Sequence, residues 1–172
     1  MDRRGRPLPW YSYPCIEFLQ RRDFSGRRVL EFGAGQSTYW WASVAREVVA
    51  IEADPRWFEK VKSASPTNAT VHLVHGDDAE AVRDVPLEGL FDVIVIDGLK
   101  REEMVDIAIN RLAPAGVIVA DDSDRYGFFQ SLRGKGFRRV DFYGAAPGII
   151  KSRVTSLFFR DGCFLFDDTH PI

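Results

Sequence analysis

The sequence contains little cysteine. Only Cys15 and Cys163 occur among the 172 residues, and they lie near opposite ends of the chain. Small disulfide-stapled domains need several cysteines, and zinc sites need closely spaced pairs of ligands. The sequence therefore argues against both a disulfide scaffold and a zinc-knuckle fold.

Long hydrophobic runs are also missing. No segment approaches the roughly 20 apolar residues that a membrane-spanning helix requires. The basic N-terminus is not followed by the apolar stretch of a signal peptide, because Pro7, Pro9 and Pro14 interrupt it. We therefore expect a cytoplasmic protein that has no membrane partner.

Neither sign of charge dominates. The chain has 23 Lys and Arg residues against 25 Asp and Glu residues, a net charge of −2, so no general attraction to nucleic acid or anionic lipid is expected. Apolar residues make up 45% of the chain and charged residues 28%, which is typical of a globular protein. We predict a single domain over residues 27–172, preceded by a lead-in, residues 1–26, that contains a short helix.

Short apolar runs alternate with longer segments of helical periodicity. The predicted strands cover residues 28–32, 48–51, 70–74, 91–96, 117–120, 137–143 and 154–159, and the predicted helices cover 16–22, 37–46, 56–63, 77–84, 101–112 and 124–133. This alternation is typical of an α/β fold in which helices cover both faces of a doubly wound, largely parallel sheet. The run at 91–96 is apolar enough to be buried on both faces.

The last two predicted strands have no helix between them. Residues 144–154 are too few and too rich in glycine and proline for a crossover helix, so they suit an antiparallel return. The same composition makes this segment the best candidate for a mobile lid. Residues 163–166 are expected to extend the last strand.

Acidic residues follow each of the first five predicted strands. In a doubly wound sheet, ligands bind at the carboxyl ends of the strands. The residues found there are Glu31, Gly33, Gly35, Ser37 and Thr38 after the first strand, Glu52 and Ala53 after the second, Asp77 and Asp78 after the third, Asp97 after the fourth, and Asp121 and Asp122 after the fifth. Such an acidic rim favours a ligand that carries hydroxyls, amines and positive charge, because carboxylates accept hydrogen bonds from a ribose diol.

The glycine-rich turn does not match a nicotinamide site well. The dinucleotide fingerprint needs a third glycine where this chain has Thr38, and Glu31 would lie close to the phosphates. An NAD(P)-dependent oxidoreductase therefore remains as a disfavoured alternative.

Taken together, the motif Glu31-Phe32-Gly33-Ala34-Gly35, the acids after strands two to four and the unbroken last strand pair resemble class I S-adenosylmethionine-dependent methyltransferases. The resemblance covers residues 27–160. It implies a Rossmann-like seven-stranded sheet of order 3-2-1-4-5-7-6 with strand 7 antiparallel. It also implies a cofactor site in which Gly33 and Gly35 approach the methionine part near Glu31, Glu52 holds the ribose, and Asp77 or Asp78 bonds the adenine amine. Ser37, Thr38, Ala53 and Asp97 complete the predicted cofactor site.

A narrower resemblance concerns Asp97-Gly98-Leu99-Lys100 and Asp121-Asp122, which look like the metal and base positions of metal-dependent catechol and caffeoyl-CoA O-methyltransferases. It implies a Mg²⁺ site at Asp97, Asp121 and Asp122, with Lys100 as the base, provided that burial and the cation lower the pKa of Lys100. We predict that either Lys100 or Asp97 deprotonates the acceptor. Asp122 departs from the usual Asn, and the lead-in is shorter than in that family. In the alternative interpretation the two acids cap the next helix and Lys100 is solvated.

We therefore predict a methyltransferase that uses S-adenosylmethionine to methylate a small molecule, at oxygen, with or without a divalent metal. The aromatic residues Trp10, Tyr11 and Tyr13 either form a flap over the cofactor or pack on the domain. A non-catalytic partner subunit is the second alternative, and exposure of Trp40 and Trp41 in a homodimer interface would support it.

Overall fold

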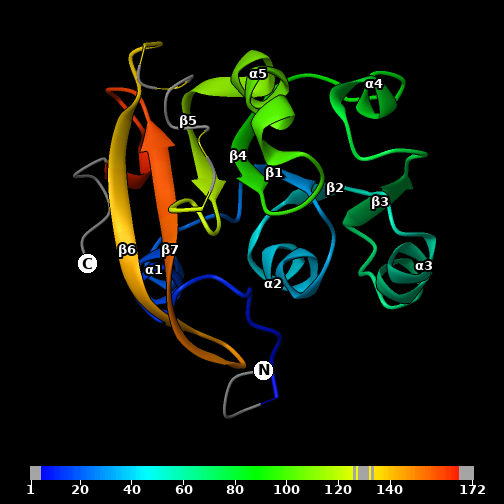
Figure 1. Cartoon of the computed structure of the whole chain (residues 1–172), viewed down its shortest axis with the longest axis horizontal. Helices are drawn as coiled ribbons and strands as arrows, with labels where there is room; N and C mark the ends of the chain where they lie inside the picture. The colour runs from blue at the N-terminus through cyan, green and yellow to red at the C-terminus, as the bar shows by residue number, and fades with distance from the viewer. Residues whose placement is uncertain (1–4, 126, 128–131, 133, 167–172) are drawn as a thin grey trace.

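A computed structural model describes residues 5–125, 127, 132 and 134–166 of the chain. Its centre is a seven-stranded sheet of order β3-β2-β1-β4-β5-β7-β6 (Figure 1). The strands are β1 (Arg28–Phe32), β2 (Glu47–Glu52), β3 (Ala69–Leu73), β4 (Phe91–Ile96), β5 (Leu112–Ala120), β6 (Arg138–Ala146) and β7 (Ile149–Phe159). β7 runs antiparallel to both β5 and β6, and the other neighbours are parallel. The predicted fold class, strand order and strand direction are confirmed.

Helices cover both faces of the sheet (Figure 1). They are α1 (Tyr13–Gln20), α2 (Gln36–Val44), α3 (Pro55–Ser63), α4 (Ala79–Val82) and α5 (Arg101–Arg111), with a short 3₁₀ helix, η1, at Phe164–Phe166. None of the helices in the described part of the chain is long and apolar enough to span a membrane.

Strand β4 shows how the sequence builds two cores. Val93 and Val95 pack with α1 and α2 on one face, whereas Ile94 and Ile96 pack with α5 on the other. Side chains of a strand alternate between faces, so a run of large apolar residues with no polar alternation is stable only between two helical layers. Because β4 is the central strand of the sheet, its carboxyl end lies in the middle of the sheet edge.

The lead-in packs into one of these cores. Tyr11, Cys15, Ile16 and Leu19 are buried there together with Trp41. The Trp41 indole nitrogen donates a 3.0 Å hydrogen bond to the Tyr11 hydroxyl. Tyr11 therefore serves packing.

The tryptophan pair is not available for an interface. Trp40 and Trp41 are both buried, and Trp41 packs edge-on against Phe24 with ring centroids 5.0 Å apart. The exposure that would have supported a homodimer interface at this pair is not found.

The segment 144–154 forms the predicted antiparallel return, and its role as a mobile lid stays a prediction. Gly144 pairs with Arg153 and Ala146 pairs with Ile149, so almost the whole segment belongs to the β6–β7 hairpin. The strands are joined at Pro147 and Gly148, and Gly148 adopts the positive φ of +76° that glycine tolerates. A two-residue turn leaves the rest of the segment free to pair between the two strands.

Two shorter predicted elements, at residues 163–166 and 124–133, have different outcomes. Residues 163–166 do not extend the last strand, because Phe164–Phe166 forms the 3₁₀ helix η1. The helix predicted over 124–133 falls largely on residues that lie outside the described part of the chain.

Candidate active site

A cavity of about 360 Å³ lies at the carboxyl ends of β1, β2, β4 and β5. It is lined by the loop after β1 (Gly33, Ala34, Gly35, Gln36 and Ser37), by Glu52 and Trp57, by Asp97, Gly98 and Arg101, by Asp122 and Arg153, and by Trp10 from the lead-in. Of the predicted cofactor residues, Gly33, Gly35, Ser37, Glu52 and Asp97 meet at this one cavity.

The loop after β1 depends on a close contact between the backbones of Gly33 and Gly98. Gly33 has a φ of +104°, and a Cβ at this position would lie 2.7 Å from the backbone nitrogen of Gly98. Gly35 differs, because its φ of 177° is extended. A Cβ on Gly35 would meet only the Trp57 ring, at 3.7 Å. Gly33 is therefore required by the fold, whereas Gly35 leaves the cavity wall open at the start of α2.

Glu52 fixes the same loop from the end of β2. Its Oε2 accepts a 3.0 Å hydrogen bond from the Ala34 amide, and its Oε1 accepts 2.9 Å bonds from the Ala53 and Asp54 amides. A carboxylate offers about four lone-pair positions. The carboxylate of Glu52 thus orders the loop and keeps acceptor capacity for a ligand in the cavity.

Thr38 and Ala53 support the loop. The Thr38 hydroxyl accepts a 2.9 Å hydrogen bond from the Gly35 amide, and its side chain is buried. Ala53 packs against the α5-side core. Both residues lie beside the cavity residues without lining the cavity.

Glu31 is buried beneath the loop. Its side chain is fully inaccessible, and neither carboxylate oxygen makes a hydrogen bond of good geometry within the described residues. Burial raises the pKa of Glu31 to about 8, although the nearby hydroxyls of Thr38 and Ser37 favour the ionised form. Glu31 therefore carries a proton at neutral pH in this arrangement.

The predicted adenine-binding acids lie at a helix start. Asp78 caps α4 by accepting a 3.1 Å bond from the Ala81 amide, and this bond lowers the pKa of Asp78. Lys100 reaches toward the same acids, with its Nζ 3.5 Å from carboxylate oxygens of both Asp77 and Asp78. Asp77 and Asp78 therefore flank the cavity on the β3 side without lining it.

Lys100 does not meet the condition for a base. The side chain is half exposed, and the carboxylate of Asp77 raises its pKa, with Glu103 and Asp78 adding to the effect. A lysine base needs the opposite, a pKa lowered by burial or by a nearby cation. Neither is provided where the three acids hold the ammonium group.

Asp97 lines the cavity and directly follows the last residue of β4. Arg101 Nη2 donates a 3.0 Å hydrogen bond to Asp97 Oδ1 and a 2.6 Å bond to the Asp97 carbonyl oxygen. Arg101 Nη1 bonds the carbonyl oxygen of Asp121 at the end of β5. Burial and the neighbouring Asp121 carboxylate raise the pKa of Asp97 despite Arg101. Asp97 is thus held in place as a group that can accept a proton near neutral pH.

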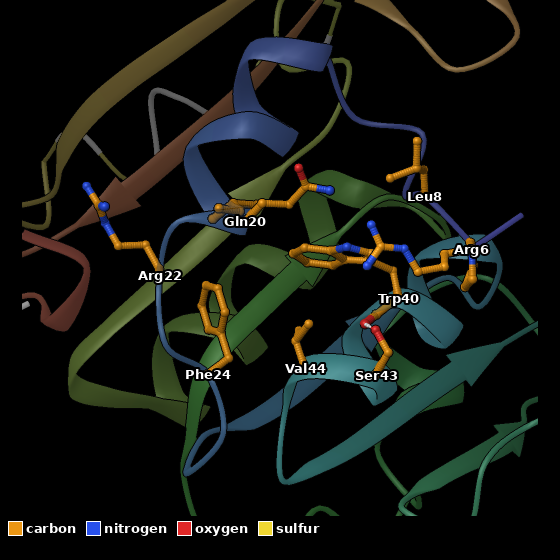
Figure 2. A pocket seen from close by; sticks show the side chains of 10 residues that line it. Arg6, Leu8, Gln20, Arg22, Phe24, Trp40, Ser43 and Val44 are labelled. Carbon is orange, nitrogen blue, oxygen red and sulfur yellow. Dashed lines mark hydrogen bonds between the residues drawn. The ribbon is translucent and has the colours of Figure 1, made fainter. Parts of the chain in front are cut away.

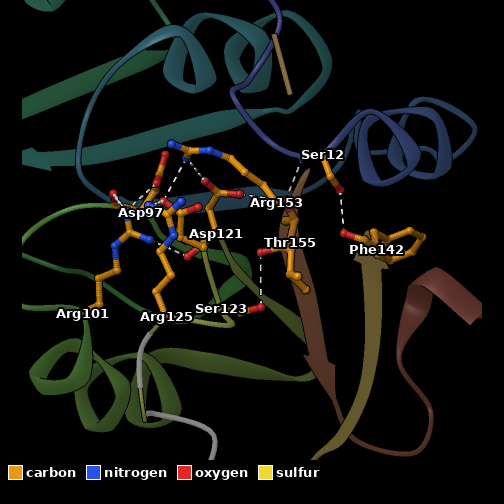
Figure 3. A network of polar contacts seen from close by, with 11 residues as sticks. Ser12, Asp97, Arg101, Asp121, Ser123, Arg125, Phe142, Arg153 and Thr155 are labelled. Carbon is orange, nitrogen blue, oxygen red and sulfur yellow. Dashed lines mark hydrogen bonds and ion pairs between the residues drawn. The ribbon is translucent and has the colours of Figure 1, made fainter. Parts of the chain in front are cut away.

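Asp121 and Asp122 pair with an arginine from β7, and Figure 3 shows this arginine, Arg153, beside Asp121. Arg153 Nη1 lies 2.9 Å from Asp122 Oδ2 and 3.6 Å from Asp121 Oδ2. Asp121 Oδ1 accepts a 2.7 Å bond from the Thr155 hydroxyl. Burial also raises the pKa of Asp121, whereas Thr155 opposes this shift.

The predicted magnesium site does not fit these donors. Within the described residues, no three Asp, Glu, His or Cys side chains converge closely enough to hold a metal ion. Mg²⁺ needs octahedral oxygen ligands at roughly 2.1 Å, but guanidinium groups bond Asp97 and Asp122, and Thr155 bonds Asp121. We therefore derive no step through a metal.

Three site residues were not predicted from the sequence, namely Trp57, Arg101 and Arg153, which line the cavity. Trp10, which was expected either to cover the cofactor or to pack on the domain, also lines it. Arg101 stands four residues after Asp97, a spacing that could have indicated an ion pair at a helix start. Arg153 has no such local signal, because its partner Asp122 lies 31 residues earlier in the chain.

A second cavity, of about 330 Å³, lies between α1 and α2 beneath the lead-in (Figure 2). Leu8, Leu19, Phe24 and Trp40 form part of its wall. None of the predicted site residues lines it, so it lies apart from the candidate active site.

The fold and the cavity define a class I S-adenosylmethionine-dependent methyltransferase. A family model described as a methyltransferase domain matches residues 30–123, more than half of the chain. The protein belongs to this methyltransferase family, so the nicotinamide-dependent alternative is wrong. A comparison with curated protein sequences found no match.

Solved structures share the fold at low identity. Cofactor-bound Rv0187 from MTB has a TM-score of 0.69 at 21% identity, with 90% of this chain and 83% of that chain covered. The O-methyltransferase TomG from Streptomyces achromogenes, solved in complex with SAM, has a TM-score of 0.63 at 19% identity, covering 83% and 77%. A methyltransferase from Pyrococcus furiosus has a TM-score of 0.60 at 21% identity, covering 86% and 81%.

Proposed function

We propose that the protein transfers a methyl group from S-adenosylmethionine to an oxygen atom of a small-molecule acceptor. The observation that carries this proposal is the single cavity in which the glycine loop, Glu52 and Asp97 meet. Its acidic wall suits a ligand with a ribose diol and a positive charge. The similarity to an O-methyltransferase solved with SAM supports the choice of oxygen.

The cofactor supplies an electrophilic methyl group on a positively charged sulfur. Gly35 leaves room for it beside Trp57, and Glu52 offers acceptor positions for its ribose. Trp10, with 51% of its surface exposed, contributes an aromatic wall that attracts a cation and limits the size of the acceptor.

Asp97 is the proposed base. It accepts the proton of the acceptor hydroxyl as the new O–CH₃ bond forms and the S–CH₃ bond breaks, so that the sulfur leaves as a neutral thioether. Arg101 orients the carboxylate through its bond to Oδ1. Holding the acceptor oxygen and the methyl group in line supplies much of the rate enhancement.

The cofactor assignment is tested by ligand-dependent melting. S-adenosylhomocysteine at about 100 times its Kd is expected to add about 2.7 kcal/mol of stability. For a chain of this size, this raises the Tm by roughly 5–10 °C. NADH, which shares the adenosine but not the thioether, is the matched control and is expected to leave the Tm unchanged. A shift with NADH and none with S-adenosylhomocysteine would overturn the assignment.

The base is tested by comparing Asp97→Asn with Lys100→Met. Asparagine keeps the acceptor for Arg101 but does not take up a proton, so turnover is expected to fall about 10²–10⁴-fold. Lys100→Met is expected to keep turnover within about threefold, because Lys100 lies among Asp77, Asp78 and Glu103 rather than in the cavity. Turnover is measured as S-adenosylhomocysteine released with a panel of catechols and phenols. The opposite ranking of the two variants would assign the proton transfer to Lys100.

A further inference from the structure

The place predicted for a divalent metal contains positive charge from the chain itself. Three carboxylates, those of Asp97, Asp121 and Asp122, are held by the two guanidinium groups of Arg101 and Arg153. A third arginine, Arg125, lies farther out, with its Nη1 3.9 Å from Asp122. The local charge of the acids is therefore nearly balanced without any added ion.

The two buried arginines have different partners. Arg101 bonds the carbonyl oxygens of Asp97 and Asp121 and so joins the ends of β4 and β5. Within the described residues, Arg153 forms ion pairs with the carboxylates of Asp121 and Asp122, and 18% of its side chain is exposed. Arg153 lines the cavity together with Asp122. The positive charge of Arg153 therefore lies at the cavity, beside the acids that were predicted to bind a metal ion.

One oxygen of each acid beside Arg153 lacks a hydrogen bond among the described residues. Asp121 is 1% exposed, yet its Oδ2 makes no hydrogen bond within the described residues, and neither does Asp122 Oδ1. Asp122 also adopts a φ of +50°, which is uncommon outside glycine. A buried carboxylate without a compensating charge is strongly unfavourable. The arrangement therefore depends on nearby cations, and Arg153 is the one that pairs with both Asp121 and Asp122 within the described residues.

We propose that Arg153 takes the place of the divalent cation, so that methyl transfer proceeds without a metal while the guanidinium stabilises the negative charge that develops on the acceptor oxygen. This inference rests on the proposed function. Its structural part, that Arg153 occupies a latent cation site formed by Asp121 and Asp122, is independent of the acceptor and can be tested by metal binding alone.

The test uses Mn²⁺ as the probe, because the electron paramagnetic resonance signal of the free aquo ion is lost on binding. The wild-type protein is expected to leave the Mn²⁺ signal unchanged at sub-millimolar concentrations. Arg153→Met removes the charge but keeps an unbranched side chain, and it is expected to bind about one Mn²⁺ per chain with at least tenfold higher affinity than the wild type. Arg153→Lys keeps a positive charge and is expected to behave like the wild type.

Arg125→Met is the matched control, because it removes an exposed arginine from the edge of the same cluster and is expected to gain no Mn²⁺ binding. Each protein is also titrated with S-adenosylhomocysteine. One bound Mn²⁺ in the wild type would overturn the inference, even if Arg153→Met does not fold. A folded Arg153→Met variant that binds S-adenosylhomocysteine but gains no Mn²⁺ would also overturn it. Failure of the wild type to bind S-adenosylhomocysteine would instead contradict the proposed function and leave the Mn²⁺ comparison valid.

Discussion

Replacing Glu31 with glutamine is expected to stabilise the folded protein at neutral and alkaline pH, by an amount that grows as the pH rises. Glu31 is fully buried, neither of its oxygens makes a hydrogen bond of good geometry within the described residues, and burial raises its pKa to about 8. Glutamine has nearly the same shape and never ionises. The variant therefore avoids the cost of taking up a proton on folding, which Glu31 must do above its unfolded pKa.

The direction follows from proton linkage. The folded pKa of Glu31 lies above the ordinary value of 4.5, so between about pH 4.5 and 8 the folded state binds more protons than the unfolded state. The stability that Glu31 contributes falls across this window as the pH rises, by at most about 5 kcal/mol. The difference in unfolding free energy between Glu31→Gln and wild type is expected to be near zero at about pH 5 and several kcal/mol at about pH 8.5.

Urea unfolding at a series of pH values measures this difference directly. Glu59→Gln is the matched control, because Glu59 is exposed on α3, and its difference from wild type is expected to stay within about 0.5 kcal/mol at every pH. A Glu31→Gln difference that does not change with pH would show that Glu31 is ionised, or hydrogen-bonded as an anion, in the folded state.

Most of the fold could be predicted because its signals are local. The apolar run that forms β4 and the proline in the first turn of α3 are signals that depend on a few neighbouring residues. The end of the chain was harder. Residues 144–154 have the composition of a loop, but pairing of β6 with β7 across a tight turn keeps most of them extended.

The cofactor side of the candidate site was predictable for a related reason. In a parallel sheet, the strand ends meet at one edge, so Gly35, Glu52 and Asp97 could be brought together from strand order alone. Arg153 could not, because its position depends on the antiparallel register that pairs Ala120 with Ser156 and so carries Arg153 past the end of β5. This long-range pairing brings the guanidinium of Arg153 to Asp121 and Asp122, which were predicted to bind a metal ion.

Gly33→Ala is expected to destabilise the fold by about 3 kcal/mol or more, because two separate effects add. A Cβ at position 33 would lie 2.7 Å from the backbone nitrogen of Gly98 and 2.8 Å from its Cα, so the ends of β1 and β4 would have to move apart. The φ of +104° is also unfavourable for alanine. Overpacking and backbone strain each cost roughly 1–3 kcal/mol. Urea unfolding of the ligand-free protein measures the loss.

Gly35→Ala separates this effect from ligand binding. Its φ is extended, and its Cβ would lie at an ordinary contact distance of 3.7 Å from Trp57, so the ligand-free stability is expected to change by less than about 1 kcal/mol. The added methyl group narrows the cavity, and the Kd for S-adenosylhomocysteine is expected to rise at least tenfold, a loss of about 1.4 kcal/mol. An equal loss of stability in Gly33→Ala and Gly35→Ala would show that the folded loop excludes a side chain at both positions. Unchanged affinity in Gly35→Ala would place the ligand away from this loop, because a methyl group that makes only an ordinary contact with Trp57 in the free protein weakens binding by occupying the space of the ligand.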